Sequence, residues 1–157
     1  MAVYSVNSLV GGGTQQNTTA TYMTQIALTA ATATLTSAAI NDIEFGTAGT
    51  PADNYMEYDV SRQTAAGSGG TTATPNAMDS TKRASGTVAY CCATGEGTVT
   101  ANTSVLYIPV NQRASYRFVA VPGAELIIPA TNLAGFALRS RSGAYTGKVG
   151  MTAIWVE

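Results

Sequence analysis

The chain has 157 residues, a formal net charge of −1 and no histidine, and only 11% of its residues are charged, against about 25% in an average soluble domain. Without histidine, a Ser-His triad, the commonest general base and most zinc sites are excluded. Eight basic residues against nine acidic ones give no broad cationic surface for nucleic acid, and no apolar run of about 18 residues predicts a membrane span.

The low charge also bears on the surface of the folded protein. A free protein normally stays soluble through interspersed surface charge and a net charge away from zero. Disorder does not explain the composition, because 45% of the residues are hydrophobic and disordered chains are poor in such residues. We therefore expect much of the surface to be covered by neighbouring subunits in an assembly.

Residues 1–19 allow two interpretations. Val3, Tyr4 and Val6 belong to a short segment that alternates like a strand, and three consecutive glycines at 11–13 form a flexible joint after it. The segment is either a frayed terminus or first strand of the domain, or a flexible N-terminal arm that docks on a neighbouring subunit. In the second case Val3, Tyr4 and Val6 lie in an interface.

Residues 20–157 carry repeated strand signals separated by turn residues. The predicted strands, in chain order, are 22–28, 32–36, 40–45, 55–62, 87–94, 104–110, 116–121, 125–128, 136–141 and 147–156. Between about 63 and 81 a Gly-, Thr- and Ala-rich stretch has no pattern and predicts a long loop. Eight to ten short strands without a helix predict one all-β domain, a jelly-roll-like β-sandwich.

The two cysteines, Cys91 and Cys92, are adjacent in the sequence. An ordinary disulfide between them is excluded, because neighbouring Cα atoms lie about 3.8 Å apart and disulfides prefer about 5.5 Å. A strained vicinal disulfide stays open as one interpretation. The other is two reduced thiols on opposite faces of a strand, at least one of them buried, as suits a protein made in a reducing cytoplasm.

Two pairs of carboxylates are the only candidates for chemistry. Asp42 and Glu44 are two residues apart, as are Glu57 and Asp59, so each pair lies on one face of a predicted strand. Such a pair can act as acid and base or hold a cation, but a solvated outer face of an amphipathic strand explains it more simply. We predict no catalytic, cofactor-binding or metal-binding residues, and no enzymatic activity.

Four arginines gather in the last third of the chain. They form either a small basic patch or ion pairs with carboxylates across an interface, and the balanced charge favours pairing. Arg139 and Arg141 share one face of a strand, where they could also protect an exposed sheet edge. The candidate interface residues are Val3, Tyr4, Val6, Arg113, Arg117, Arg139, Arg141 and Trp155.

About half of the chain carries a family resemblance. Its segments are residues 111–125, 129–136, 142–147 and the closing 154–157, with 57–62 and 74–75 in the first half. They resemble the small virion proteins of tailed bacteriophages known as capsid decoration or cement proteins. The resemblance implies a β-sandwich bound to the outside of a capsid as a trimer, and it carries over no catalytic or metal-binding residue.

The expected function is therefore capsid decoration, in which the protein binds the outer capsid surface and stabilises contacts between capsomers. The expected partners are the major capsid protein and further copies of the chain, with no cofactor, nucleic acid or membrane. The expected location is the virion, after synthesis in the host cytoplasm, since residues 1–6 lack the features of a signal peptide. The alternative is a tail-associated β-sandwich that binds a receptor or glycan. A glycan hydrolase is disfavoured by the absence of histidine.

Overall fold

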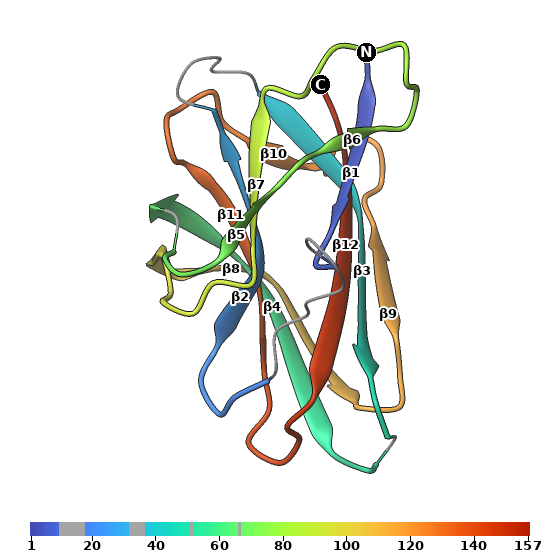
Figure 1. The fold of residues 1–157 in the computed structure, drawn as a ribbon, viewed down its shortest axis with the longest axis vertical. Coiled ribbons are helices and arrows are strands. Elements are labelled where there is room, and N and C mark those ends of the chain that lie inside the picture. The colour runs from blue at the N-terminus through green and yellow to red at the C-terminus, as the bar shows by residue number, and fades with distance from the viewer. Residues whose placement is uncertain (10–17, 32–36, 51, 66) are drawn as a thin grey trace.

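The computed structural model describes residues 1–9, 18–31, 37–50, 52–65 and 67–157. The glycines at 11–13 and the predicted strand at 32–36 lie outside the described residues. Two six-stranded antiparallel sheets face each other, and the described residues form no helix (Figure 1). The all-β sandwich predicted from the sequence is confirmed at this level.

Sheet 1 contains both ends of the chain. Its strands, in spatial order, are β10 (Leu126–Ile128), β3 (Ala38–Ala48), β12 (Lys148–Val156), β1 (Val3–Asn7) and β6 (Asn76–Ala77). A further strand, β9 (Tyr116–Val119), also pairs with β3. Because β12 occupies one edge of β3, β9 and β10 share the other edge, and the turn at residues 120–125 interrupts the outer edge of this sheet.

Sheet 2 lies on the other side of the core, on the left in Figure 1. Its strands, in spatial order, are β5 (Thr71–Ala73), β7 (Thr87–Cys91), β2 (Met23–Ala30), β11 (Gly135–Arg141), β4 (Tyr55–Ala65) and β8 (Thr98–Asn111). Strands β4 and β11 lie next to each other and carry all the charged residues found in the strands of this sheet.

The core forms between the sheets because the strands alternate in burial. Along β12 every second residue is buried, ending at Trp155, which stacks on Tyr4 of β1 with ring centroids 6.0 Å apart. Phe45 of β3 packs on Tyr58 of β4 across the sandwich at 5.1 Å. Each such side chain contributes about 1.5 to 3 kcal/mol relative to an exposed one, so these contacts hold the two sheets together.

The single chain is a compact body. Its accessible surface is 7387 Å², close to the roughly 7400 Å² expected for a compact monomer of its mass, 16.1 kDa. The core is therefore complete within one chain. How much of the outer surface neighbouring subunits cover stays a prediction.

The N-terminal segment is a strand of the chain's own sandwich. β1 pairs with β12 along its whole length, from Val3 opposite Val156 to Asn7 opposite Thr152, and with β6 on its other side. Of the two interpretations of residues 1–19, the structure thus has the first strand over Val3–Asn7. Burial of alternate side chains on a sheet that already has a partner explains why this short segment is held in place.

The interval predicted as a long loop, 63–81, is a loop only in part. β4 continues to Ala65, and the short strands β5 and β6 follow at Thr71–Ala73 and Asn76–Ala77. β5 pairs with β7 and β6 pairs with β1. These partners are distant in sequence, so a local pattern of Gly, Thr and Ala residues could not reveal them.

Candidate functional site

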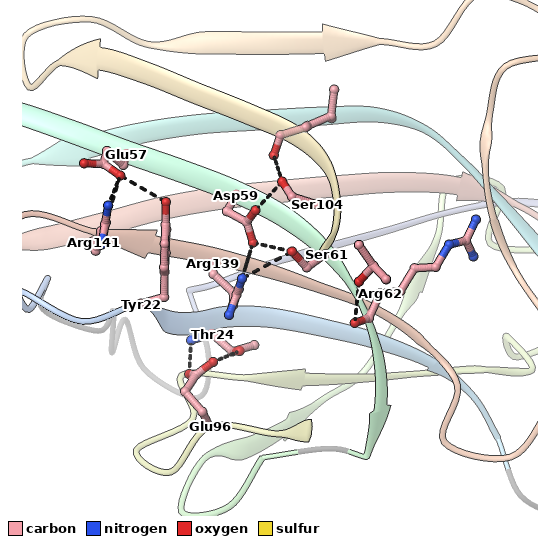
Figure 2. Close-up of polar contacts among 12 residues, drawn as sticks. Tyr22, Thr24, Glu57, Asp59, Ser61, Arg62, Glu96, Ser104, Arg139 and Arg141 are labelled. Atoms are coloured by element: carbon pink, nitrogen blue, oxygen red, sulfur yellow. Dashed lines mark hydrogen bonds and ion pairs between the residues drawn. The ribbon is translucent and has the colours of Figure 1, made fainter. Parts of the chain in front are cut away.

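The outer face of sheet 2 carries a network of ion pairs between β4 and β11 (Figure 2). The guanidinium of Arg139 lies against the carboxylate of Asp59, with Nη2 2.6 Å and Nε 2.8 Å from Oδ2. Two residues away on each strand, Arg141 contacts Glu57, with Nη2 2.6 Å from Oε2. The antiparallel register places each arginine directly opposite its carboxylate, which explains both pairs.

Hydroxyl groups complete the network around Asp59. Ser61 donates to Oδ2 at 2.7 Å and Ser104 of β8 donates to Oδ1 at 2.5 Å. Only 5% of the Asp59 side chain and 17% of the Arg139 side chain are exposed. A buried charge is tolerated only when it is paired and hydrogen-bonded, and both oxygens of Asp59 meet that condition.

Tyr22 joins the two ion pairs. Its ring centroid lies 4.8 Å from Cζ of Arg139 and 4.6 Å from Cζ of Arg141, within cation–π range. Its hydroxyl donates to Oε2 of Glu57 at 3.1 Å. Burial, together with this hydrogen bond, raises the pKa of Tyr22 to about 12, and the hydrogen bond to Glu57 raises the pKa of Arg141.

This arrangement does not favour acid–base chemistry. Each carboxylate is already bound by a guanidinium and at least one hydroxyl, so both oxygens of Asp59 and Oε2 of Glu57 are occupied. The interpretation of Glu57 and Asp59 as a solvated outer face is wrong for Asp59, which is buried by its partners. The described residues contain no group of three or more Cys, Asp or Glu side chains suited to hold a metal ion.

The predicted pairing of Arg139 and Arg141 occurs within the chain. The sequence suggested either ion pairs across an interface or protection of a sheet edge. β11 lies between β2 and β4, so it is not an edge, and the carboxylates come from the neighbouring strand of the same chain. The prediction that both arginines share a strand face is confirmed by the register.

A groove of about 500 Å³ crosses the outer face of sheet 1 at the end away from the chain termini. Its floor contains Gly46 and Gly150, which are opposite each other in β3 and β12. Neither glycine has a positive φ, and a Cβ atom at Gly46 would meet only the Cβ of Ser115, at 3.9 Å. Backbone conformation therefore does not require a glycine at either position, and the missing side chains leave the groove open.

Charged and aromatic side chains form the walls of this groove. Arg117 of β9 binds Asp42, with Nη2 2.5 Å from Oδ2, and lies 3.6 Å from Glu44. The hydrogen bond to Asp42 raises the pKa of Arg117. Tyr116 packs on Phe45 at 6.5 Å. The complete lining is Glu44, Phe45, Gly46, Ser115, Tyr116, Arg117, Gly150, Met151 and Thr152.

The remaining candidate interface residues are divided between core and surface. Tyr4, Val6 and Trp155 are buried between the sheets. Their side chains cannot contact a neighbouring subunit, so their prediction as interface residues is wrong and they belong to the core. Val3 lies half-exposed on the outer face of sheet 1. Arg113 is exposed and forms an ion pair with Asp53 at 3.2 Å.

The two cysteines are not in a disulfide. Cys91 is fully buried, and burial raises its pKa to about 12. Cys92 follows the strand with a φ of 58°, which turns its side chain back. The two Sγ atoms consequently lie 3.6 Å from the carbonyl oxygens of successive residues, Asn7 and Ser8. The prediction of one buried thiol is confirmed, whereas the placement on opposite strand faces is wrong.

Three features of these sites could not be predicted from the sequence. They are the position of Tyr22 between two guanidinium groups, the contact of Thr24 with Glu96, and the opposed glycines of the groove. Each depends on contacts between segments that are far apart in sequence. An alternating pattern gives the face of a residue but not its neighbour on the next strand.

Comparison with protein-family models, with curated proteins and with solved structures gave no match. The described residues form no helix long and apolar enough to cross a membrane.

Proposed function

We propose that the protein is a decoration protein of a tailed-bacteriophage capsid, which binds the outer capsid surface and stabilises contacts between capsomers. The observation that carries this proposal is the exposed apolar edge of sheet 1. Val119 is 59% exposed and Val121 is 67% exposed, and both fall within residues 111–125, the longest segment of the family resemblance. A charge-poor protein that exposes aliphatic side chains at an edge is suited to contact another protein there.

The order of the strands supports a jelly roll. We count β9 and β10 as one interrupted strand. In sequence order, the first strand then pairs with the last, the second with the next to last, and so on inwards: β1 with β12, β2 with β11, β3 with β9 and β10, and β4 with β8. This nested pairing, distributed over two sheets, is the arrangement of two Greek keys in a jelly roll. β5, β6 and β7 form an excursion between β4 and β8.

Two features of the exposed edge hinder strand pairing between successive copies of the chain, which would lead to aggregation. Pro122 and Gly123 lie in the turn between β9 and β10, and Gly123 has a φ of 89°. A proline and an interruption of the strand are the devices by which natural proteins prevent aggregation through sheet edges. The side chains of Val119 and Val121 nevertheless remain available, so a specific side-chain contact fits this edge better than strand addition.

In this role the partners are the major capsid protein and further copies of the chain, as a trimer on the outside of the virion. Many weak contacts repeated by the capsid symmetry then give a stable shell through avidity. The role requires no catalytic residue, cofactor, nucleic acid or membrane. Synthesis in the host cytoplasm agrees with the reduced state of both thiols.

The test is add-back of purified protein to virus particles assembled without it. We expect the wild-type chain to bind on the order of hundreds of sites per particle and to raise the temperature at which particles rupture. Val121→Glu should bind about tenfold or more weakly, because a charge would be desolvated in the contact. Val88→Glu is the control, because Val88 is an exposed valine of sheet 2. Density for the chain only at the tail, in a cryo-EM map, would contradict the proposal.

The groove favours one second candidate, a tail-associated domain that binds a glycan. Tyr116, Arg117 and Glu44 all line the groove and are exposed, and residues of these kinds can contact and hydrogen-bond to a sugar. In that case Gly46→Val, which adds a side chain to the groove floor, should abolish binding to host-cell glycans, whereas Val88→Glu on sheet 2 should not.

A further inference from the structure

A row of aliphatic side chains crosses the outer face of sheet 1 at the end that holds the chain termini. Its members lie opposite one another on neighbouring strands: Val3 faces Val156, Val156 faces Ala39, and Ala39 faces Ile127. Met78 extends the row, because its N–H donates to the carbonyl of Val3 at 2.8 Å beyond the end of β6. We call these five residues the aliphatic row: Met78, Val3, Val156, Ala39 and Ile127.

The aliphatic row faces away from the core. The inward residues of the same strands, such as Tyr4, Trp155 and Ile128, are buried between the sheets. Met78 is 64% exposed, Ile127 45% and Val3 39%. Scattered exposed aliphatic residues are ordinary on a protein surface, but a row in register across a whole sheet is contiguous, and a contiguous apolar patch of about 300 Å² or more is often functional.

The row itself contains no charged residue. Next to it in sequence, Asp79 follows Met78 and pairs with Lys82 at 3.6 Å, and Glu125 lies two positions before Ile127. The next row along the strands contains Ser5, Ile154, Asp42 and Val119. Its single charge, Asp42, is neutralised by Arg117 at 2.5 Å. The outer face of sheet 2, by contrast, carries the ion-pair network of Glu57, Asp59, Arg139 and Arg141. The sandwich therefore has one charged face and one face that is apolar at one end.

We propose that the aliphatic row is the surface through which this chain binds a second copy of itself. A charge-bearing partner would lose hydration on this surface without gaining an opposite charge, whereas a second copy brings aliphatic side chains against aliphatic side chains. Two sheets packed face to face stand about 10 Å apart, which suits side chains the size of valine, isoleucine and methionine.

The area of the row sets the expected strength of the contact. Strands about 4.8 Å apart place the five side chains over about 19 Å. With Ile154 of the next row, the apolar area is on the order of 300 Å², against the roughly 800 Å² that each partner buries in a standard interface. The row therefore forms the dry centre of an interface with a polar rim, and we expect association that is reversible and depends on concentration.

The inference rests on the part of the proposed function in which further copies of the chain are partners, and it adds the surface through which they bind. Its test uses the purified chain without any capsid, so its failure is distinguishable from a failure of capsid binding. Sedimentation equilibrium of the full chain should show a mass that rises with concentration. Val3→Glu should weaken association about tenfold or more, since a charge would be buried against an aliphatic surface. Val105→Glu is the matched control: both valines lie on strands and both are 39% exposed, but Val105 belongs to β8 of sheet 2. It should change the dissociation constant less than about twofold.

Ile127→Glu, at the other end of the row, should reproduce the effect of Val3→Glu, and fluorescence of the single tryptophan reports that each variant is folded. A dimer indicates two rows packed about a two-fold axis, and a trimer indicates a row packed on the edge of the next copy.

Two results would overturn the proposal. One is a wild-type chain that stays monomeric while Val3→Glu loses capsid binding, which would assign the row to the capsid protein. The other is equal weakening by Val3→Glu and Val105→Glu.

Discussion

Asp59 has a carboxylate that is almost completely removed from solvent, and its partners decide whether that charge stabilises the fold. Both oxygens accept hydrogen bonds, from Arg139, Ser61 and Ser104. Breaking a buried pair by removing one partner is strongly destabilising, because the other charge is left without compensation. An exposed pair such as Arg117 and Glu44, 3.6 Å apart, contributes far less, since water screens it.

We predict that Asp59→Ala lowers the free energy of unfolding by about 3 kcal/mol, because Arg139 keeps its charge without a partner. Asp59→Asn should lose less, since one acceptor oxygen remains. Glu44→Ala is the control and should cost under about 0.5 kcal/mol. Urea unfolding followed by circular dichroism measures all three. If Asp59→Ala and Glu44→Ala have the same small effect, the network does not stabilise the fold and a role in binding becomes the better explanation for it.

At the scale of elements, β12 and the residue after it hold down the connection between β6 and β7. The carboxylate of Glu157 accepts hydrogen bonds from the hydroxyl of Ser85 at 2.5 Å and from the backbone N–H groups of Gly86 and Thr87 at 2.8 and 3.0 Å. The indole of Trp155 donates to the same carboxylate at 3.2 Å. One side chain thus links a long loop to the strand that carries the largest core residue.

This link predicts a dependence on pH. Burial tends to raise the pKa of Glu157, but the hydrogen bonds outweigh burial, so the pKa in the folded chain is below its usual range. A lowered folded pKa stabilises the fold above the unfolded value of about 4.3. That contribution is lost as the pH falls through the lower folded pKa. Glu157→Gln removes one acceptor oxygen and the charge, so it should destabilise by about 1 kcal/mol at pH 7.

The measurement is urea unfolding of the wild type and Glu157→Gln between about pH 7 and pH 3, followed by fluorescence of Trp155, which lies beside the carboxylate. We expect the difference between the two proteins to be constant above about pH 5 and to shrink below about pH 4. A difference that does not change with pH would show that the charge of Glu157 does not contribute.

Strands with a clear local pattern were predictable from the sequence, including the short β9 and β10 at the predicted 116–121 and 125–128, whereas β5 and β6 were not. The predicted strand at 55–62 corresponds to β4, and the one at 136–141 corresponds to β11. β5 and β6 were missed because their only stabilising partners, β7 and β1, come from distant segments. The turned-back side chain of Cys92 was missed because a positive φ has no signature at a non-glycine residue.

The candidate sites divide in the same way. That Arg139 and Arg141 share a face follows from the two-residue period of a strand. That they face Asp59 and Glu57 depends on β4 being the neighbour of β11, which is a property of the topology. The aliphatic row is the extreme case, because its five residues come from five segments and no two of them are close in sequence. Low charge in the sequence indicated a covered surface without indicating where it lies.

At the scale of the whole molecule, the two outer faces differ in how they can hold a partner. The outer face of sheet 2 has its charges paired internally, so it has little electrostatic attraction left to offer. The outer face of sheet 1 has an aliphatic row at one end and, at the other end, a groove lined by Arg117, which forms an ion pair with Asp42. A net charge of −1 adds no long-range repulsion between copies. Association should therefore follow the hydrophobic effect and not attraction between charges.

Salt separates these two driving forces. We predict that raising sodium chloride from about 0.05 M to about 0.5 M, which shortens the screening length from about 14 Å to about 4 Å, changes the dissociation constant of self-association less than about twofold. Ammonium sulfate should strengthen association, because excluded salts favour burial of apolar surface. Sedimentation equilibrium at each salt concentration measures both effects. Weakening by sodium chloride of about tenfold would instead indicate ion pairs in the contact, with Arg113 and its exposed partner Asp53 as the first residues to change.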